Sequence, residues 1–174
     1  RRFEWTRNTA RIEGPVDKTD WGMTPPTVNA YFNPVNNEIV FPAGILQPPY
    51  FDPTADMAVN YGATGATIGH EISHGFDDQG RKYDETGALR DWWTEKDAAA
   101  YEAQAKMLVE QFNQYEPLPG VKINGELTLC ENIADLAGLA IAYRAYHIAL
   151  GGKDAPVING MTGDQRFFLG YAMS

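Results

Sequence analysis

The chain has 174 residues, 44% hydrophobic and 21% charged, and this composition predicts one globular domain with a substantial core. Its formal net charge of −9 argues against nucleic-acid binding, because a phosphate backbone needs clustered Lys and Arg. The single cysteine, Cys130, excludes an internal disulfide and a thiolate zinc cluster, and no apolar run approaches the roughly 20 residues of a membrane helix.

The first part of the chain suggests little regular structure before a hairpin. There is no initiator Met and no signal peptide, so residues 1–174 are expected to be a single domain from a longer protein. Residues 1–27 are rich in Pro, Gly and charge and are predicted to be irregular. Two β-prone runs, at 27–32 and 38–41, are separated by Asn and Pro turn formers and predict a hairpin.

Helical patterns account for most of the remaining chain. A glycine-rich helix is predicted at about 58–75, and its glycines indicate that another backbone packs close to it. Thr94 starts a second helix, the segment 129–149 forms a third, and a fourth begins at 163. Asn124-Gly125 predicts a short hairpin. The expected fold class is α+β, mainly helical, with small β hairpins at one side.

The stretch "IGHEISHGFDD" (68–78) carries the strongest chemical signal. His70 and His74 are four residues apart, so both imidazoles can reach one ion from the same helix face. Glu71 is turned away from that face and can reach a water molecule at the ion, which is the H-E-x-x-H arrangement of a zinc metalloprotease. The alternative is a pair of surface histidines. The apolar and glycine neighbours argue against it, because they predict a buried helix where unpaired polar groups are costly.

A catalytic zinc site needs a third protein ligand, and with no cysteine cluster it should be a carboxylate. Glu131 and Asp135 lie four apart on one predicted helix, so one can bind the metal while the other orients a ligand histidine. Thr128-x-x-Glu131 also matches a capping box, in which the glutamate only satisfies a helix end. Asp77 and Asp78 are rival ligands or outer partners. From spacing alone these alternatives stay open.

Three blocks, "VNAYFNPVNNEIVFPAGILQPPYF", "IGHEISHGFDDQGRKYDETGALRDWW" and "NGELTLCENIADLAGLAIAYRAY", strongly resemble the neprilysin and endothelin-converting enzyme family of zinc metallopeptidases. The resemblance runs from about Thr19 to Ala172. It implies the catalytic core of a gluzincin (thermolysin-like) zinc peptidase that hydrolyses oligopeptides. It favours this family over a thermolysin-like protease outside it. A purely structural zinc site is a further alternative, which would have four protein ligands and no metal-bound water.

The resemblance also assigns roles to particular residues. The family's zinc ligands fall on His70, His74 and Glu131, and its catalytic glutamate falls on Glu71. The aspartate that orients a ligand histidine falls on Asp135. The family's "NA" pair, which hydrogen-bonds the substrate backbone, falls on Asn29 and Ala30. One Zn²⁺ per chain and a peptide substrate are therefore expected.

The chain departs from the family pattern at two positions. Cys130 stands where the family usually has glycine, and it is interpreted as a small buried residue, with oxidation or altered metal affinity as the lesser alternative. Thr67 stands where an aliphatic residue often helps to line the S1′ pocket, so that preference is open. His147 lies on a helix face with Tyr143 and Tyr146 and is interpreted as structural.

Full family members are several times longer than this chain. They carry a downstream histidine and arginine that steady the oxyanion and the substrate, and a large helical domain that covers the cleft. The resemblance therefore implies an N-terminal helical domain and a C-terminal segment of the same polypeptide as partners. A zinc-binding but catalytically incomplete fragment is the alternative function. Family members generally work outside the cytoplasm, and a single cysteine is more typical of a bacterial member than of the disulfide-rich animal relatives.

Overall fold

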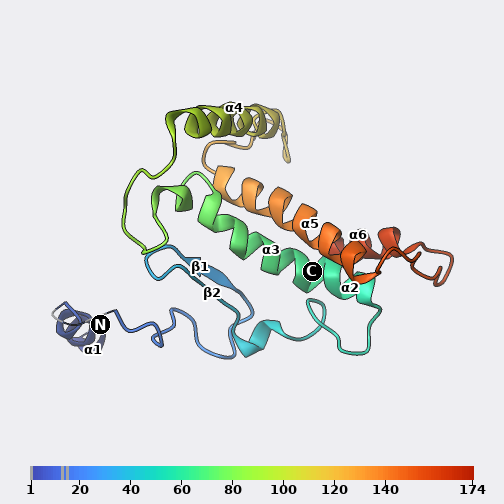
Figure 1. Ribbon diagram of the computed structural model, residues 1–174, viewed down its shortest axis with the longest axis horizontal. Coiled ribbons are helices and arrows are strands. Elements are labelled where there is room, and N and C mark those ends of the chain that lie inside the picture. Colours follow the sequence, from blue (N-terminus) through green and yellow to red (C-terminus); the bar gives the residue numbers. More distant parts are fainter. Residues whose placement is uncertain (1, 13, 15) are drawn as a thin grey trace.

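The computed structural model describes residues 2–12, 14 and 16–174. Helices are the main regular structure in this part of the chain, and its sheet has two strands (Figure 1). In chain order the helices and strands are α1 (Arg2–Ala10), β1 (Tyr31–Asn33), β2 (Glu38–Val40), α2 (Met57–Asn60), α3 (Ala66–Ser73), α4 (Glu95–Phe112), α5 (Leu129–Ala149) and α6 (Gly163–Met173). Short turns join them: the 3₁₀ turns η1 (Ala43–Ile45), η3 (His74–Phe76) and η4 (Gly80–Lys82), and the π-helical turn η2 (Tyr61–Gly65).

The centre of the fold is the pair α3 and α5, which lie along each other (Figure 1). A β-carbon added to Gly69 would lie 2.6 Å from the carbonyl oxygen of Gly138, so only glycine fits at this point of contact. The predicted close approach of a second backbone is therefore confirmed. The expected burial of the whole helix is not, because Ile68 and Ile72 are 40% and 42% exposed.

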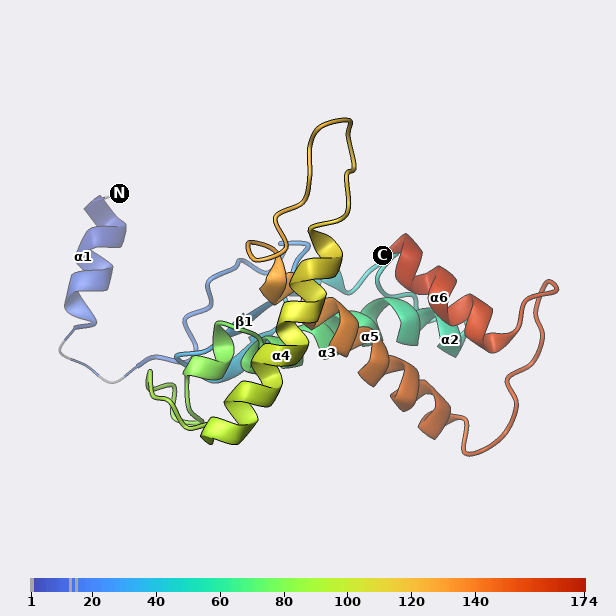
Figure 2. The ribbon, with the colours of Figure 1, turned by 90° about the horizontal axis from the view of Figure 1, so that it is seen from above.

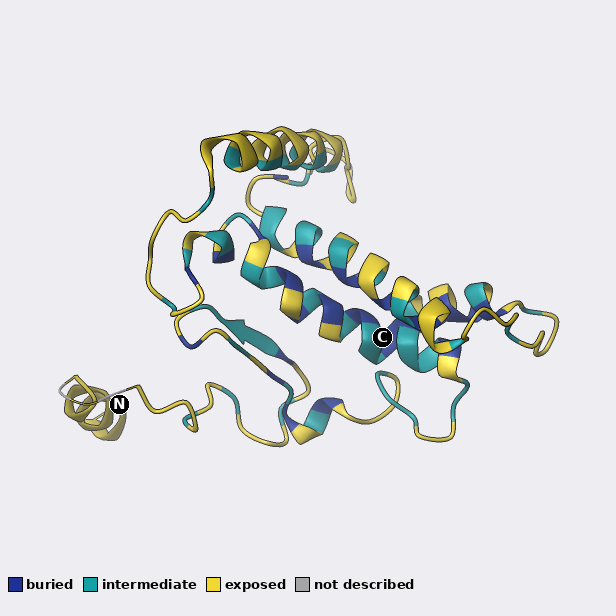
Figure 3. Cartoon of the chain, in the orientation of Figure 1, coloured by how far each residue is buried: buried dark blue, intermediate teal, exposed yellow. Residues whose placement is uncertain are grey.

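A small apolar core lies where α2, α3, α5 and α6 meet. Its fully buried members are Ala58, Ala66, Ala142, Tyr146 and Phe167. Burial is concentrated on the facing sides of these helices, whereas α1 and the outer face of α4 are exposed (Figure 3). The core therefore lies where the start of α3 packs on the last turns of α5. The opposite end of this helix pair carries polar side chains.

The predicted hairpin is present, and its strands are shorter than expected. Tyr31 pairs with Val40 and Asn33 with Glu38 in an antiparallel register. The first strand starts at Tyr31 rather than at 27, because residues 25–27 contact η1 instead of β2. The backbone N–H of Gly44 donates to the carbonyl of Pro25 at 2.8 Å. In Figure 1, β1 lies between β2 and α3.

Two predictions for local structure were wrong. Residues 2–10 are helical, although the segment 1–27 was expected to be irregular. The Pro and Gly residues of that segment all lie beyond residue 10, so they do not interrupt this helix. The helix α1 buries no residue and lies apart from the other helices in Figures 1 and 2. The sequence of α1 therefore lacks the regularly spaced apolar residues from which a helix can be predicted.

The second error concerns the loop between α4 and α5. The antiparallel bridge there joins Leu118 to Val121 around Gly120, not around Asn124-Gly125. The side chain of Asn124 accepts hydrogen bonds from the backbone N–H groups of Glu126 and Leu127, both at 3.1 Å. This arrangement turns the chain into α5 instead of closing a hairpin.

The other three long helices begin close to their predicted residues. Thr94 caps α4 by accepting from the backbone N–H of Asp97 at 3.1 Å, and Thr162 caps α6 in a capping box with Gln165. Across the described part of the chain, no helix combines the length and the apolar character needed to cross a membrane.

Candidate metal centre

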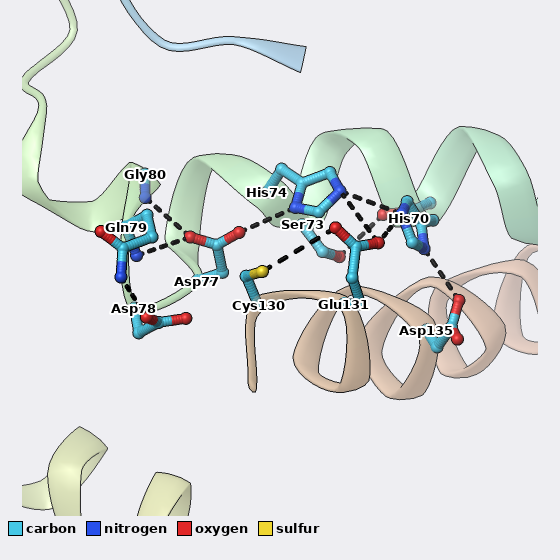
Figure 4. A network of polar contacts seen from close by, with 11 residues as sticks. His70, Ser73, His74, Asp77, Asp78, Gln79, Gly80, Cys130, Glu131 and Asp135 are labelled. Carbon is cyan, nitrogen blue, oxygen red and sulfur yellow. Dashed lines mark hydrogen bonds and ion pairs between the residues drawn. The ribbon is translucent and has the colours of Figure 1, made fainter. Parts of the chain in front are cut away.

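Three side chains, from α3, from the turn η3 that continues it, and from α5, converge at one point beside β1 (Figure 4). The Nε2 atoms of His70 and His74 lie 2.9 Å apart. Oε2 of Glu131, in the first turn of α5, lies 3.4 Å from the first nitrogen and 3.9 Å from the second. Ligands 2.0–2.1 Å from a tetrahedral zinc ion are about 3.3 Å from one another. The spacing of these three atoms therefore fits a single small divalent cation.

A carboxylate orients each of the two histidines. Nδ1 of His70 lies 2.8 Å from Oδ1 of Asp135, and Nδ1 of His74 lies 2.7 Å from Oδ2 of Asp77. A carboxylate accepts a hydrogen bond, so each ring donates from Nδ1 and directs the lone pair of Nε2 toward the other ring. Two lone pairs and a carboxylate oxygen at this distance repel one another unless a cation lies between them. The donor set therefore fits a metal such as zinc.

The Asp77 carboxylate is itself held firmly. It is 3% exposed, and its Oδ1 accepts from the backbone N–H groups of Gln79 at 2.8 Å and Gly80 at 2.7 Å. Burial pushes the pKa of Asp77 upward, but the hydrogen bonds from His74 and from these N–H groups outweigh it and leave the pKa below its ordinary value. The bond to Asp77 in turn raises the pKa of His74. Asp77 is thus a charged partner of His74 rather than a rival ligand.

Glu71 follows His70 on α3 and faces the interior. It is 5% exposed, and in the described part of the chain its Oε2 is buried without a hydrogen-bond partner. Burial raises the pKa of Glu71, while the neighbouring His70 and His74 oppose the shift. A buried carboxylate oxygen without a partner is costly unless a water or a ligand satisfies it. Glu71 lies beside the two histidines, so a water that bonds to its Oε2 could also bind an ion held by those histidines.

Glu131 was expected to be either a metal ligand or part of a capping box with Thr128, and the two roles need different side-chain contacts. In α5 the side chain of Thr128 makes no capping hydrogen bond, and it accepts instead from Nδ2 of Asn132 at 2.9 Å. The capping box is therefore absent, and Glu131 faces the histidines.

Cys130 is half-buried, with its Sγ 3.8 Å from Oε1 of Glu131. Burial and the Glu131 charge raise the pKa of the thiol, which keeps it protonated.

Two pockets flank the convergence point. One, of about 680 Å³, is lined by the three motif residues His70, Glu71 and His74, and also by Glu131, Asn29, Ala30 and Cys130. The other, of about 430 Å³, is lined by Thr67, Tyr50 and Asp135, and also by Asn29, His70 and Glu71. Asn29 borders both pockets and is exposed, whereas Ala30 is buried just before β1. An extended chain lying along β1 would therefore pass over the histidines.

Two other sequence candidates lie outside the convergence point. His147 is near the far end of α5, where its Nε2 lies 3.1 Å from Asp164 and its ring packs on Tyr143. Asp78 accepts from the Gln79 side chain and contacts neither histidine. The sequence alone does not predict whether Asp77 or Asp78 is the partner of His74, because the choice depends on how the turn after them folds.

Comparison with known proteins places this site in context. The model of peptidase family M13 matches residues 29–174. Human endothelin-converting enzyme 1 is 44% identical over 173 residues, covering 98% of this chain and 22% of the relative. Neprilysin-3 of Drosophila melanogaster is 44% identical over 169 residues, covering 95% and 21%.

Solved structures agree with the sequence relatives. The zinc metalloprotease Zmp1 of Mycobacterium tuberculosis, in complex with an inhibitor, superimposes with a TM-score of 0.94 at 56% identity, covering 98% of this chain and 27% of that one. PepO from Lactobacillus rhamnosis gives a TM-score of 0.78 at 45% identity, covering 91% and 24%. The chain thus spans about a quarter of the length of these relatives. On sequence and structure together, the chain belongs to peptidase family M13.

Proposed function

We propose that this chain is the catalytic core of a zinc-dependent endopeptidase that hydrolyses oligopeptides. The observation that carries the proposal is the convergence of His70, His74 and Glu131 within the distances that one zinc ion requires. The two histidine nitrogens and one carboxylate oxygen form a three-ligand set, which is typical of catalytic rather than structural zinc. Membership of family M13 supports the same activity.

His70, His74 and Glu131 would hold the zinc ion, which would act as a Lewis acid on a water molecule and on a peptide carbonyl. Glu71 would accept a proton from that water as its oxygen bonds to the carbonyl carbon, and would pass the proton to the amine nitrogen as the C–N bond breaks. Its burial beside the two histidines and its unpartnered Oε2 suit it to both transfers. Asp135 and Asp77 hold His70 and His74 in the tautomer that directs Nε2 toward the ion.

Asn29 and Ala30 would hold the substrate backbone. They lie immediately before β1, and Asn29 borders the two pockets on either side of Glu71. A peptide extended along this segment would place the side chains next to the cleaved bond in those pockets. Thr67 lines the second pocket, so it would help to choose the residue accepted there.

The wider setting is also part of the proposal. A gluzincin-type fold is supported by the glutamate ligand on α5, a helix separate from the α3–η3 segment that carries both histidines. Since the relatives are about four times longer, we propose that residues 1–174 act as one catalytic subdomain within a longer protein. The family resemblance supports a place of action outside the cytoplasm.

Two measurements on the same purified chain test the proposal. Elemental analysis should give one zinc per chain, and a quenched-fluorescence peptide should be cleaved until a chelator is added. Zinc binding without cleavage would favour the alternative of a catalytically incomplete zinc-binding fragment. A chain that binds no zinc would contradict both.

A further inference from the structure

The turn that follows the second histidine controls the orientation of that histidine. Oδ2 of Asp77 faces Nδ1 of His74 at 2.7 Å, while Oδ1 is held by the backbone N–H groups of Gln79 and Gly80. These two donors belong to the start of η4. If η4 shifted, the Asp77 carboxylate would lose the contacts that fix it, and His74 would lose its orienting partner.

One side of η4 rests directly on the end of α3. A β-carbon added to Gly80 would lie 1.8 Å from the carbonyl oxygen of His74 and 3.2 Å from the α-carbon of Gly75. No side chain fits there, so the turn touches the histidine segment backbone to backbone. This contact prevents η4 from moving closer to the histidine segment, but it does not prevent η4 from moving away from that segment.

The other side of η4 is held by Arg81. Its guanidinium carbon lies 4.8 Å from the ring centroid of Tyr101 on α4 and 5.6 Å from that of Trp93, both within the range of a cation–π contact. One guanidinium nitrogen also lies 3.2 Å from Glu102, but the Glu102 side chain is 67% exposed and such exposed pairs contribute little. The aromatic faces are therefore the main anchor.

The burial of Arg81 agrees with this. Its side chain is 17% exposed, and in the described part of the chain its Nε atom is buried without a hydrogen-bond partner. A guanidinium that gains so few hydrogen bonds is kept in place by packing and by the rings. The Arg81 side chain thus links the loop 77–82 to the helix α4.

We propose that Arg81 is a positioning residue for the metal centre. By stacking on Tyr101 and Trp93 it holds η4 against α3, so that the N–H groups of Gln79 and Gly80 keep Asp77 on His74. This inference rests on the proposed function, because it takes zinc as the ion at His74. It assigns to α4 a role in metal binding, although α4 contributes no ligand.

The first test measures zinc affinity by competition with a chromophoric chelator. Arg81→Ala and Tyr101→Ala should each weaken zinc binding about tenfold, the lower end of what loss of an outer partner causes. Arg81→Lys should also weaken it, because lysine keeps the charge and loses the planar stack. Tyr101→Phe keeps the aromatic ring and should bind zinc as tightly as the parent does. Glu102→Gln and Arg90→Ala are matched controls and should bind zinc as the parent does.

A second readout separates positioning from general stability. In the zinc-free chain, the proton on Nδ1 of His74 should give a downfield NMR signal that Arg81→Ala and Arg81→Lys weaken or remove. Unfolding by urea is measured for every variant. Variants that lose stability but keep the parent zinc affinity and the His74 signal would overturn the inference.

The outcomes also distinguish this inference from the function on which it rests. A parent chain that binds no zinc would remove the proposed function and the role of Arg81 with it. A parent that binds one zinc ion tightly, while both Arg81 variants and Tyr101→Ala bind it equally well, would remove only the role of Arg81.

Discussion

Gly138 of α5 lies so close to α3 that a β-carbon on it would come within 2.4 Å of the backbone nitrogen of His70. Across the same contact, Gly69 faces Gly138. This pair sets the distance between α3, which carries His70 and leads into His74, and α5, which carries Glu131. The geometry of the metal centre therefore depends on two residues that bear no functional group.

Replacing Gly138 with Ala should destabilise the fold by about 1–3 kcal/mol, because the added methyl group has no space and must force the helices apart. The gain in helix propensity, about 1 kcal/mol, offsets only part of this. Urea unfolding measures the loss. Gly65→Ala is the control, because a β-carbon there meets Ala142 at an ordinary 3.6 Å. Equal stability of the two variants would contradict the close-contact interpretation.

The sequence revealed those parts of the site that depend on local spacing. His70, Glu71 and His74 lie within one helical turn, so their arrangement follows from the helix alone. Whether Glu131 is a ligand or a cap could not be decided in this way, because both need the same residue at the start of α5. The answer depends on where α5 lies against α3.

Other features were hidden for a similar reason. Asp77 becomes the partner of His74 only because the chain turns back at Gly80, and sequence spacing does not show that turn. The helix α1 buries no side chain, so it leaves no apolar period. The hairpin placed at Asn124-Gly125 failed because the Asn124 side chain bonds to the backbone that leads into α5. Long-range packing and side-chain-to-backbone bonds account for these differences.

Glu71→Gln should lower peptide hydrolysis at least a hundredfold while the zinc content stays at one per chain. The amide is the same size as the carboxylate but cannot accept a proton, so the general base is lost and the ligands are intact. Turnover of a quenched-fluorescence peptide and elemental analysis on the same sample provide the two readouts. Normal turnover by the variant would refute the role of Glu71.

Glu131→Gln should reduce zinc content well below one per chain, because it removes a charged ligand. Asp135→Ala should keep the site but weaken zinc binding by about 10–100-fold, since His70 loses its orienting partner. Chelator competition measures both. Glu126→Gln, an exposed residue just before α5, is the control. If Asp135→Ala binds zinc like this control, the orienting role is wrong.

Acid should weaken the fold through Asp84, which lies in the loop after η4. Its carboxylate accepts from Thr86 and from the backbone of Ala88 and pairs with Arg90, and these contacts hold the pKa below its ordinary value. A lowered folded-state pKa means that the stabilisation is present above the unfolded value near 3.8 and is lost as the pH falls through the folded one. The difference in urea midpoint between the parent and Asp84→Asn should therefore be smaller at pH 3 than at pH 6. A difference that is equally large at both pH values would contradict this.

The pair of the buried Arg166 and the half-buried Asp56 fixes α6 to the start of α2. Nε of Arg166 lies 2.6 Å from Oδ2 of Asp56, and the arginine side chain is only 5% exposed. Asp56→Ala should destabilise the chain by about 3 kcal/mol, because it leaves a buried charge without its partner. Glu110→Ala breaks the exposed pair with Lys106 and should cost less than about 1 kcal/mol.

The double variant Asp56→Ala with Arg166→Met separates the two causes of that loss. If the cost comes from the unpaired charge, an apolar methionine removes it and stability returns most of the way to the parent value. If the cost comes from lost attraction between the two groups, the double variant stays as unstable as Asp56→Ala. Urea unfolding of the parent and the three variants decides between them, and we expect the recovery because the Arg166 side chain is only 5% exposed.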